Sequence, residues 1–210
     1  MEQVQDVLDL LDWKRRTFAL YQSIRTASDP RQAWDKWKET RNELFRSHPQ
    51  SPIPEEQRSN FAGLDLYDYD PGWRVLAAVD PVEPQTYDVP TSGHETFSFE
   101  RVGVARFELR NTPTTLEIYW LTAYGGGLFV PFRDTTSGKH TYGAGRYLLD
   151  TVKGADLGSE QGKLVLDFNF AYNPSCSYDP KWVCPLAPPP NRLDLQITAG
   201  ERHSSDNRTK

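Results

Sequence analysis

The residues best suited to chemistry lie between Phe132 and Tyr147, where a short polar stretch separates two apolar segments. The stretch is dense in arginine, hydroxyl side chains and glycine, whereas an ordinary connection needs only a few turn residues. Arginine can bind a carboxylate or phosphate through two parallel hydrogen bonds, and glycine lets backbone N–H groups approach a ligand. The stretch therefore predicts a binding surface for a small anionic or polar molecule. Its predicted ligand-binding residues are Arg133, Asp134, Ser137, Tyr142 and Arg146.

Two later segments are expected to complete this site. From Asp167 to Tyr172, polar and aromatic residues alternate, as in a strand with one polar face. The prolines at 188–190 predict a rigid extended connector that presents the polar residues after it. We expect all three segments to meet in a cleft at one end of a β domain, and the later two contribute Asp167, Asn169, Tyr172, Asn173, Asn191 and Arg192. The alternative is that these side chains only satisfy neighbouring backbone groups, which is common for Asp and Asn near turns.

A hydrolase or transferase is the alternative function, with Asp134, Asp167 or Cys176 acting in a pocket. A nucleophilic cysteine needs a lowered pKa or a neighbouring base, and the sequence identifies neither. The sequence also leaves open whether Cys176 and Cys184 are thiols or a disulfide, although a reducing compartment favours thiols. Seven residues separate them, more than the about two to four typical of zinc sites, so no metal is predicted. No cofactor is predicted either, because a split-barrel flavin binder would rest on fold analogy alone.

Composition and charge narrow the possible partners. Hydrophobic residues make up 37% of the chain and charged residues 25%, which is typical of a folded globular protein. The formal net charge of −5 disfavours nucleic acid, because a negative protein repels the phosphate backbone. No stretch approaches the ~20 apolar residues that span a bilayer, and the first residues lack a secretory signal pattern. We therefore expect a cytoplasmic protein that binds neither nucleic acid nor membrane, and the oligomeric state stays open.

Residues 1–62 predict a helical arm. Apolar residues recur at helical spacing on one face of a first helix, which extends to Arg25. Asp29 and Pro30 give the start signal of a second helix, and the prolines that follow His48 end it. Residues 55–61 predict another helical turn.

The second helix carries Trp34 and Trp37 on a mostly apolar stripe. We expect both tryptophans to dock the arm onto the β domain, because large aromatic side chains dominate buried contacts. A different possibility is a protein-interaction module in which the tryptophan-rich arm is itself the docking surface.

Residues 63–201 predict a β-rich domain. Short runs of β-branched and aromatic residues alternate with Gly, Pro, Asn or Asp and lack intervening amphipathic helices, a pattern typical of antiparallel sheets. The predicted strands are Arg74–Val79, Glu95–Arg101, Val104–Arg110, Thr114–Tyr124, Leu128–Phe132, Thr141–Leu149, Lys163–Asn169 and Leu193–Thr198. Arg110 and Asn111 fall in a predicted hairpin turn. The expected fold class is α+β, with N-terminal helices packed on a mostly antiparallel β barrel or curled sheet, and a disordered tail at 202–210.

Three sequence runs resemble a known family. They are FRDTTSGKHTYGAGRYL at 132–148, DFNFAYNPSC at 167–176 and CPLAPPPNR at 184–192, and they close on an Ala-Gly-Glu run at 199–201. In this order they resemble a prokaryotic family known only as a domain of unknown function, and residues 46–52 and 61–64 resemble its amino-terminal part. The resemblance covers residues 34–201, with Ser175 and Ala187 standing where the family usually has proline. It implies one family unit and carries over no catalytic residue, so the predicted site depends on its side chains alone.

Overall fold

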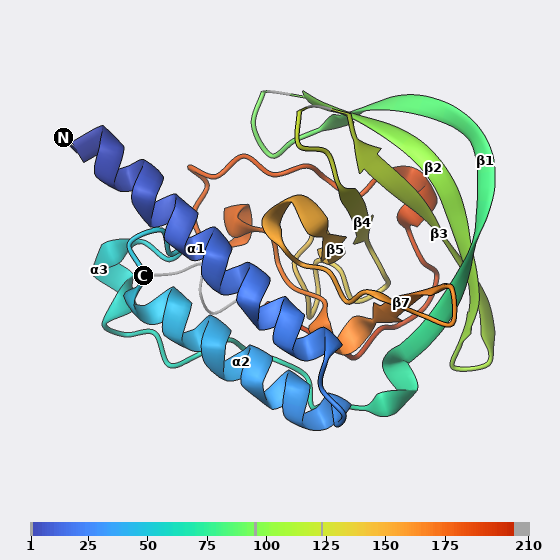
Figure 1. Ribbon diagram of the computed structural model, residues 1–210, viewed down its shortest axis with the longest axis horizontal. Helices are drawn as coiled ribbons and strands as arrows, with labels where there is room; N and C mark the ends of the chain where they lie inside the picture. The colour runs from blue at the N-terminus through green and yellow to red at the C-terminus, as the bar shows by residue number, and fades with distance from the viewer. Residues whose placement is uncertain (1, 95, 123, 204–210) are drawn as a thin grey trace.

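The computed structural model describes residues 2–94, 96–122 and 124–203, which adopt an α+β fold (Figure 1). Three helices precede the sheet, namely α1 (Glu2–Arg25), α2 (Pro30–Ser47) and α3 (Glu55–Arg58). Helix α2 begins where the sequence predicted because the Asp29 carboxylate accepts the backbone N–H of Arg31 at 2.9 Å. The expected helices are thereby confirmed.

One antiparallel sheet of seven strands follows, in the order β5-β4-β3-β2-β1-β7-β6. The strands are β1 (Arg74–Pro90), β2 (Thr96–Leu109), β3 (Thr112–Leu121), β4 (Leu128–Phe132), β5 (Arg146–Asp150), β6 (Ser159–Glu160) and β7 (Lys163–Asp167). Single 3-10 turns are η1 (Pro71–Trp73), η2 (Thr151–Lys153), η3 (Phe168–Phe170), η4 (Ser175–Ser177) and η5 (Pro189–Asn191). The order ends at β5 and β6, so the sheet curls but does not close (Figure 1). A barrel was the wrong expectation, and the alternative of a curled sheet describes the fold.

The hairpin between β2 and β3 has the turn that the sequence predicted. Arg110 and Asn111 adopt φ angles of 52° and 61°, as a two-residue turn with the twist of its strands requires. The segments expected as two strands, 95–101 and 104–110, form the single strand β2, apart from Glu95, which lies outside the described residues, and Arg110, which belongs to the turn. Pairing with β3 continues past an irregularity between Arg101 and Gly103, so the glycine bends the strand rather than ending it.

Some predicted strand regions are not strands in the described chain. Of the predicted strand 141–149, residues 141–145 form an isolated bridge and a turn, and β5 begins only at Arg146. Residues 193–198 are irregular, because their backbone bonds to the polar stretch instead, with the Ile197 N–H donating to Asp134 at 2.8 Å. After Asp167 the chain turns into η3, since the Asp167 side chain accepts the backbone N–H of Asn169 at 3.0 Å. The polar and aromatic alternation after Asp167 therefore marks a capped turn, in which side-chain hydrogen bonds replace strand pairing.

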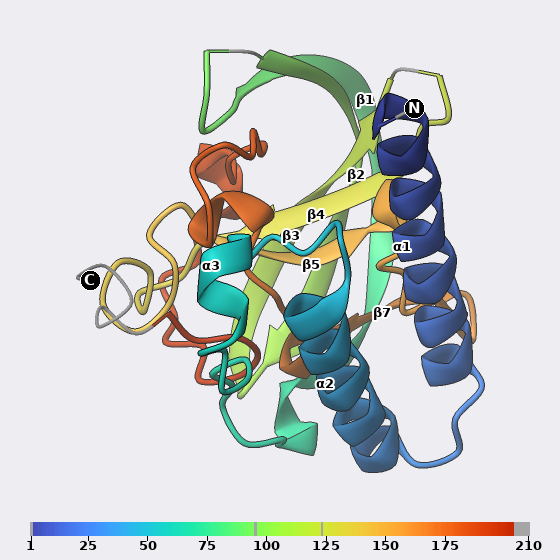
Figure 2. The ribbon, with the colours of Figure 1, turned by 90° about the vertical axis from the view of Figure 1, so that its left-hand side faces the viewer.

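Helices α1 and α2 lie on one side of the curled sheet and share its hydrophobic core (Figure 2). Trp34 and Trp37 are both buried, and the indole N–H of Trp34 donates to the Asn169 carbonyl at 3.0 Å. The indole N–H of Trp37 donates to the Tyr21 hydroxyl at 3.1 Å, which ties α2 to α1. The tryptophans thus dock the arm as expected, and their polar ends are satisfied.

The chain end is tied to the rest of the fold up to His203. The Arg202 N–H donates to the Asp65 carbonyl at 2.8 Å, and the His203 N–H donates to the His140 carbonyl at 2.9 Å. The remainder of the predicted tail, 204–210, lies outside the described residues. Among the described residues, no helix combines the length and the apolar character needed to cross a bilayer.

Candidate functional site

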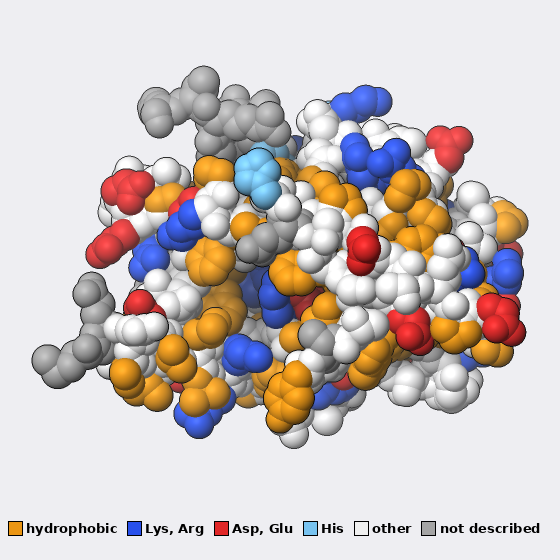
Figure 3. Space-filling model, turned by 90° about the horizontal axis from the view of Figure 1, so that it is seen from above, with side chains coloured by type: hydrophobic (Ala, Val, Ile, Leu, Met, Phe, Trp, Pro, Cys, Tyr) orange, Lys and Arg blue, Asp and Glu red, His pale blue; other side chains and the backbone are white. Residues whose placement is uncertain are grey.

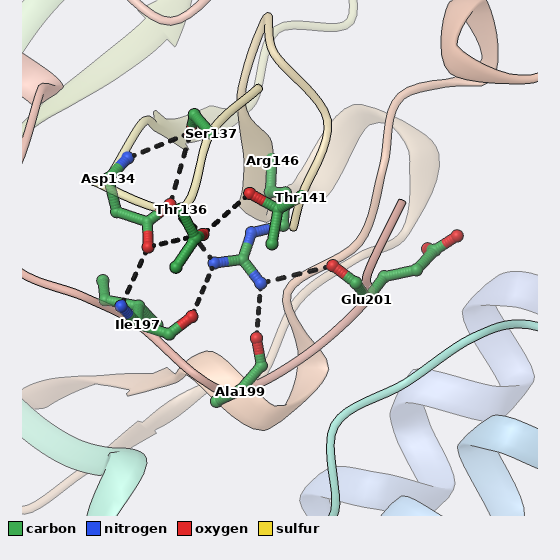
Figure 4. Close-up of polar contacts among 8 residues, drawn as sticks. All are labelled: Asp134, Thr136, Ser137, Thr141, Arg146, Ile197, Ala199 and Glu201. Atoms are coloured by element: carbon green, nitrogen blue, oxygen red, sulfur yellow. Dashed lines mark hydrogen bonds and ion pairs between the residues drawn. The ribbon is translucent and has the colours of Figure 1, made fainter. Parts of the chain in front are cut away.

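Arg146, at the start of β5, lies in the interior with its side chain 1% exposed (Figure 4). Its guanidinium donates to the carbonyls of Ile197, at 3.2 Å, and of Ala199, and forms an ion pair with Asp134 at 3.5 Å. Burial lowers the Arg146 pKa, opposed by Asp134. This arginine therefore fastens residues 197–201 to the sheet, and its contacts support a structural role.

Asp134 is the centre of the same network (Figure 4). One of its carboxylate oxygens accepts the Thr136 hydroxyl at 2.9 Å and the Ser137 hydroxyl at 3.2 Å, and the other accepts the Ile197 N–H at 2.8 Å. The Thr136 and Thr141 hydroxyls are 2.8 Å apart, so the loop closes on itself. The density of polar residues that predicted a ligand surface is used here to satisfy a buried loop.

Asp167 and Asn169 form a second buried network. The Asp167 carboxylate accepts the Asn169 side-chain amide at 2.8 Å, and that amide also donates to the Asp70 carbonyl at 2.8 Å. The side-chain oxygen Oδ1 of Asn169 accepts the Asp70 N–H at 3.0 Å. Burial raises the pKa of Asp167 to about 6. These contacts join η3 to the entrance of β1.

A third group of predicted site residues consists of Asn191, Arg133 and Arg192. Asn191 is fully buried, accepts the Glu117 N–H at 2.8 Å and donates to the Pro131 carbonyl at 2.8 Å. Arg133 and Arg192 lie side by side through a backbone bridge, with Arg133 half-buried and Arg192 exposed. Within the described residues neither guanidinium is paired with a carboxylate, so both stay available to a ligand.

Two further predicted residues, Tyr172 and Asn173, flank a cavity between the helical arm and the β domain. The cavity measures about 70 Å³, and Tyr172 and Asn173 line it from the segment after η3. Arg41 lines it from α2, and Lys153 lines it from η2. Among its described lining residues none is a carboxylate, so this hollow carries positive charge and hydroxyl groups. Tyr142 lies apart from it, with its hydroxyl 3.7 Å from the Cys176 sulfur.

Arg41 is held by three aromatic rings and one hydrogen bond among the described residues. Its guanidinium carbon lies 4.9 Å from the ring centroids of Trp37 and Phe45 and 5.0 Å from that of Tyr172. Within the described residues its one polar partner is Glu201, at 3.2 Å, and its buried Nε has no acceptor. Stacking fixes the plane of a guanidinium and leaves its edge donors for another group.

Glu201 lies behind Arg41, outside the cavity lining, and its side chain is 2% exposed. It accepts the Asn173 N–H at 3.0 Å. Burial raises the pKa of Glu201 to about 7, although Arg41 opposes the shift. Asn173 donates its side-chain amide to the Arg202 carbonyl at 2.9 Å, while its buried Oδ1 has no donor among the described residues.

Lys153 forms the second cation of the cavity. Its ammonium lies 3.6 Å from the Asp150 carboxylate, whose pKa burial raises. Burial also raises the pKa values of the tyrosines that line the cavity, Tyr21, Tyr147 and Tyr172, which therefore carry neutral hydroxyls at ordinary pH. The cavity thus has two cations, Arg41 and Lys153. Burial raises the pKa of the carboxylate that pairs with each of them.

Sequence reasoning missed Arg41 and Glu201 as site residues. Arg41 falls on the apolar stripe of the second helix, and a charged residue on a core-facing stripe is the signal that would have identified it. Glu201 belongs to the Ala-Gly-Glu run that closes the family resemblance. The sequence contains no signal for their pairing, because 159 residues lie between them.

The protein belongs to the class of α+β proteins with an open antiparallel sheet and a helical arm, and a mostly apolar cavity with a few polar groups lies at their junction. Residues 59–202 match the family model DUF1684, described as a protein of unknown function, and the chain belongs to this family. The solution NMR structure of the uncharacterized protein from gene locus rrnAC0354 of Haloarcula marismortui is similar. It is 38% identical, with 80% of this chain and 91% of that chain covered and a TM-score of 0.58. No curated protein matches the chain. The predicted resemblance to a family of unknown function is confirmed.

Proposed function

We propose that this protein binds a small anionic ligand in the cavity between the helical arm and the β domain. The observation that supports this most strongly is Arg41, a stacked arginine that lines the cavity and has one hydrogen bond. Arg146 also has an unpaired Nε, but it lies outside the cavity lining and already donates to three carbonyls. Binding pockets typically combine an apolar lining with a few polar groups that fix a ligand's orientation.

The unpaired atoms indicate the chemistry of the ligand. Arg41 offers donors to an anionic oxygen, and Asn173 offers a buried acceptor to a hydroxyl or protonated oxygen. A buried polar atom without a partner costs free energy that a ligand recovers. The volume of about 70 Å³ limits the ligand to a few non-hydrogen atoms. A short hydroxycarboxylate or a hydrogen phosphate meets both requirements.

Calorimetric titration with glycolate, acetate and inorganic phosphate at about pH 6 tests the proposal. We expect glycolate to bind with a Kd of ~1 mM or lower. Acetate, which lacks the hydroxyl donor, is expected to bind about fivefold more weakly. Absence of binding by all three probes to the wild-type protein would refute the proposal.

The decisive variant is Arg41→Lys, which keeps the charge but loses the planar fork. It should weaken glycolate binding about tenfold. The matched control is Arg31→Lys, because Arg31 is on the same helix, stacks on Trp34 at 5.3 Å and pairs with Asp35, yet lies outside the cavity. Equal affinities of the two variants would exclude Arg41 as the anion contact.

The polar loops remain a second proposed location for the same function. Arg133 and Arg192 lie side by side, and neither guanidinium has a carboxylate partner in the described part of the chain, which supports anion contact at the surface. The double variant with lysine at both positions separates the two locations. Loss of glycolate binding in that variant, with binding retained in Arg41→Lys, would move the site to the loops.

If the protein is instead an enzyme, Cys176 is the best candidate for its reacting residue. The carboxylates of Asp134 and Asp167 are buried and accept hydrogen bonds from neighbouring groups, whereas Cys176 is half-buried. Acyl or group transfer at Cys176 would leave a covalent adduct on that thiol. Intact-mass measurement after incubation with an activated ester such as p-nitrophenyl acetate tests this, and an unmodified Cys176 would remove the alternative.

If the protein is instead an interaction module, its docking surface must lie on α1. Trp34 and Trp37 are buried, but Val4 and Val7 on α1 are 64% and 63% exposed. Figure 3 shows hydrophobic side chains gathered over the first turns of this helix. A second copy of the chain is the partner most simply tested, by light scattering over a range of protein concentrations. A monomer at all concentrations would exclude self-association through this surface.

A further inference from the structure

The two cysteines, separated in sequence, meet beside the ligand cavity. Cys176 lies in η4 directly after Ser175, a cavity-lining residue, and is half-buried, whereas Cys184 is 2% exposed. The Cys184 thiol lies within hydrogen-bonding reach of the Cys176 sulfur. The fold therefore places an accessible sulfur in contact with a protected one.

The surrounding fold fixes both cysteines. Ser92, just after β1, holds Cys184 twice, because its N–H donates to the Cys184 carbonyl at 2.9 Å and its hydroxyl accepts the Cys184 N–H at 3.1 Å. Cys176 is positioned by nearby Tyr178, whose ring packs against Phe45 of α2 with 5.2 Å between the ring centroids. One cysteine is thus anchored to the sheet and the other to the helical arm.

Hydrogen-bond donors gather around the Cys176 sulfur. They are the Cys184 thiol and the Tyr142 hydroxyl, the latter at 3.7 Å, whereas the Ser92 hydroxyl donates its proton to the Trp182 carbonyl at 3.1 Å. Donors stabilise a thiolate more than a neutral thiol, and here they lower the pKa of Cys176 to about 6, led by Cys184. The same contact raises the pKa of Cys184, because its proton is held by the neighbouring sulfur. Cys176 is the nucleophile of the pair, and Cys184 keeps its proton.

We propose that Cys176 and Cys184 are a peroxide-reactive dithiol, with Cys176 as the attacking sulfur and Cys184 as the resolving one. The Cys176 thiolate attacks one oxygen of a hydroperoxide, the O–O bond breaks, and the released alkoxide or hydroxide takes a proton to become an alcohol or water. Cys176 is then a sulfenic acid. This assignment goes beyond anion binding and does not require it.

Resolution follows from the change of charge at Cys176. Oxidation removes the negative sulfur that held the Cys184 proton, so Cys184 ionises and attacks the sulfenic sulfur. The S–O bond breaks, hydroxide leaves and takes the Cys184 proton as water, and a disulfide forms. The net reaction converts two thiols and one hydroperoxide to a disulfide, an alcohol or water, and water. Both electrons come from the thiols, and a thiol reductant restores them.

The first test is the pH profile of iodoacetamide alkylation of reduced wild-type protein. We expect a midpoint near pH 6 for Cys176. At about pH 6 its larger thiolate fraction, offset by lower nucleophilicity, should make it react about tenfold faster than a model thiol. A midpoint at or above that of a model thiol would overturn the proposal.

Two tyrosine variants examine the surroundings of the sulfur. Tyr142→Phe removes a donor and should move the midpoint to higher pH. Tyr178→Phe is the control, because that hydroxyl is buried in the same loop and has no partner among the described residues. Equal shifts in both variants would mean that loop packing, rather than the Tyr142 hydroxyl, sets the reactivity.

The second test follows the product. Equimolar hydrogen peroxide should convert the wild type to a Cys176–Cys184 disulfide, identified by intact mass and peptide mapping. Cys184→Ala should stop at the sulfenic acid, which dimedone traps, and Cys176→Ala should remain reduced. Disulfide absent from the wild type, or oxidation of Cys184 in Cys176→Ala at the wild-type rate, would refute the assigned roles.

Discussion

At the scale of single residues, a buried arginine and a partly buried one have different surroundings, Arg146 and Arg41 respectively. Arg146 donates to three carbonyls and pairs with Asp134, so its charge holds chain segments together. Arg41 rests on aromatic rings, has one carboxylate partner and lines a cavity. The first pattern is that of a structural arginine, and the second is that of a residue able to contact a ligand.

Replacing Arg146 by methionine should lower the free energy of unfolding by ~3–5 kcal/mol, because it leaves Asp134 as an uncompensated buried charge. The control is Arg133→Met, at the other end of the same polar stretch, where the half-buried side chain has no carboxylate partner among the residues that the structure describes. Its effect should stay below about 1 kcal/mol. Urea unfolding of both variants measures the difference, and similar losses would contradict a structural role specific to Arg146.

Glu201 should make stability depend on pH. Its pKa is raised from 4.5 to about 7 in the folded protein, so the folded state holds the proton more tightly than the unfolded state. This contribution is therefore complete below about pH 4.5 and is lost as the pH rises through about 7. Its size is about 3 kcal/mol at most. Asp167, whose pKa is raised to about 6, adds a change of the same sign.

Unfolding measured between about pH 5 and 8 checks this expectation. Glu201→Gln cannot ionise and should flatten the decline, whereas Glu43→Gln, on the exposed face of α2, should leave it unchanged. Stability that rises over this range in the wild type would show that the sign is wrong. Glycolate affinity should fall over the same range, because ionised Glu201 competes with the ligand for Arg41.

At the scale of elements, the start of α2 positions the arginine of the cavity. Asp29 caps the helix by accepting the N–H groups of Arg31 and Gln32, at 2.9 and 3.2 Å. The cap determines where the helical turns begin, and Trp34, Trp37 and Arg41 then fall on the face that meets the β domain. The position of Arg41 thus depends on a local signal twelve residues earlier.

Asp29→Ala should lower the free energy of unfolding by about 1 kcal/mol, because it removes the acceptor of two helix N–H groups. Asp35→Ala is the matched control, since Asp35 is on the same helix and makes only an exposed ion pair with Arg31. That change should cost less than about 0.5 kcal/mol. Thermal and urea unfolding compare the two, and equal effects would argue against capping by Asp29.

At the scale of the whole molecule, local signals predicted the fold better than the site. The Asp29 cap, the Arg110–Asn111 turn and the tryptophan stripe are encoded within a few residues, and each appeared where expected. Closure of the sheet depends on how distant strand edges meet, so the barrel alternative was wrong. Density of polar residues predicted ligand contact for Asp134 and Arg146, which form a buried network, because that density does not distinguish a buried loop network from a ligand site.

The hydrogen bonds from Arg146 to residues 197–201 also affect how the protein folds during its synthesis. Synthesis delivers the guanidinium well before the carbonyls of Ile197 and Ala199 that receive its hydrogen bonds. A nascent chain therefore carries an unsatisfied cation at the edge of its forming core until translation passes the last of these acceptors. Early release from the ribosome would leave that charge facing an incomplete interior, and such fragments would be natural targets for proteases and chaperones.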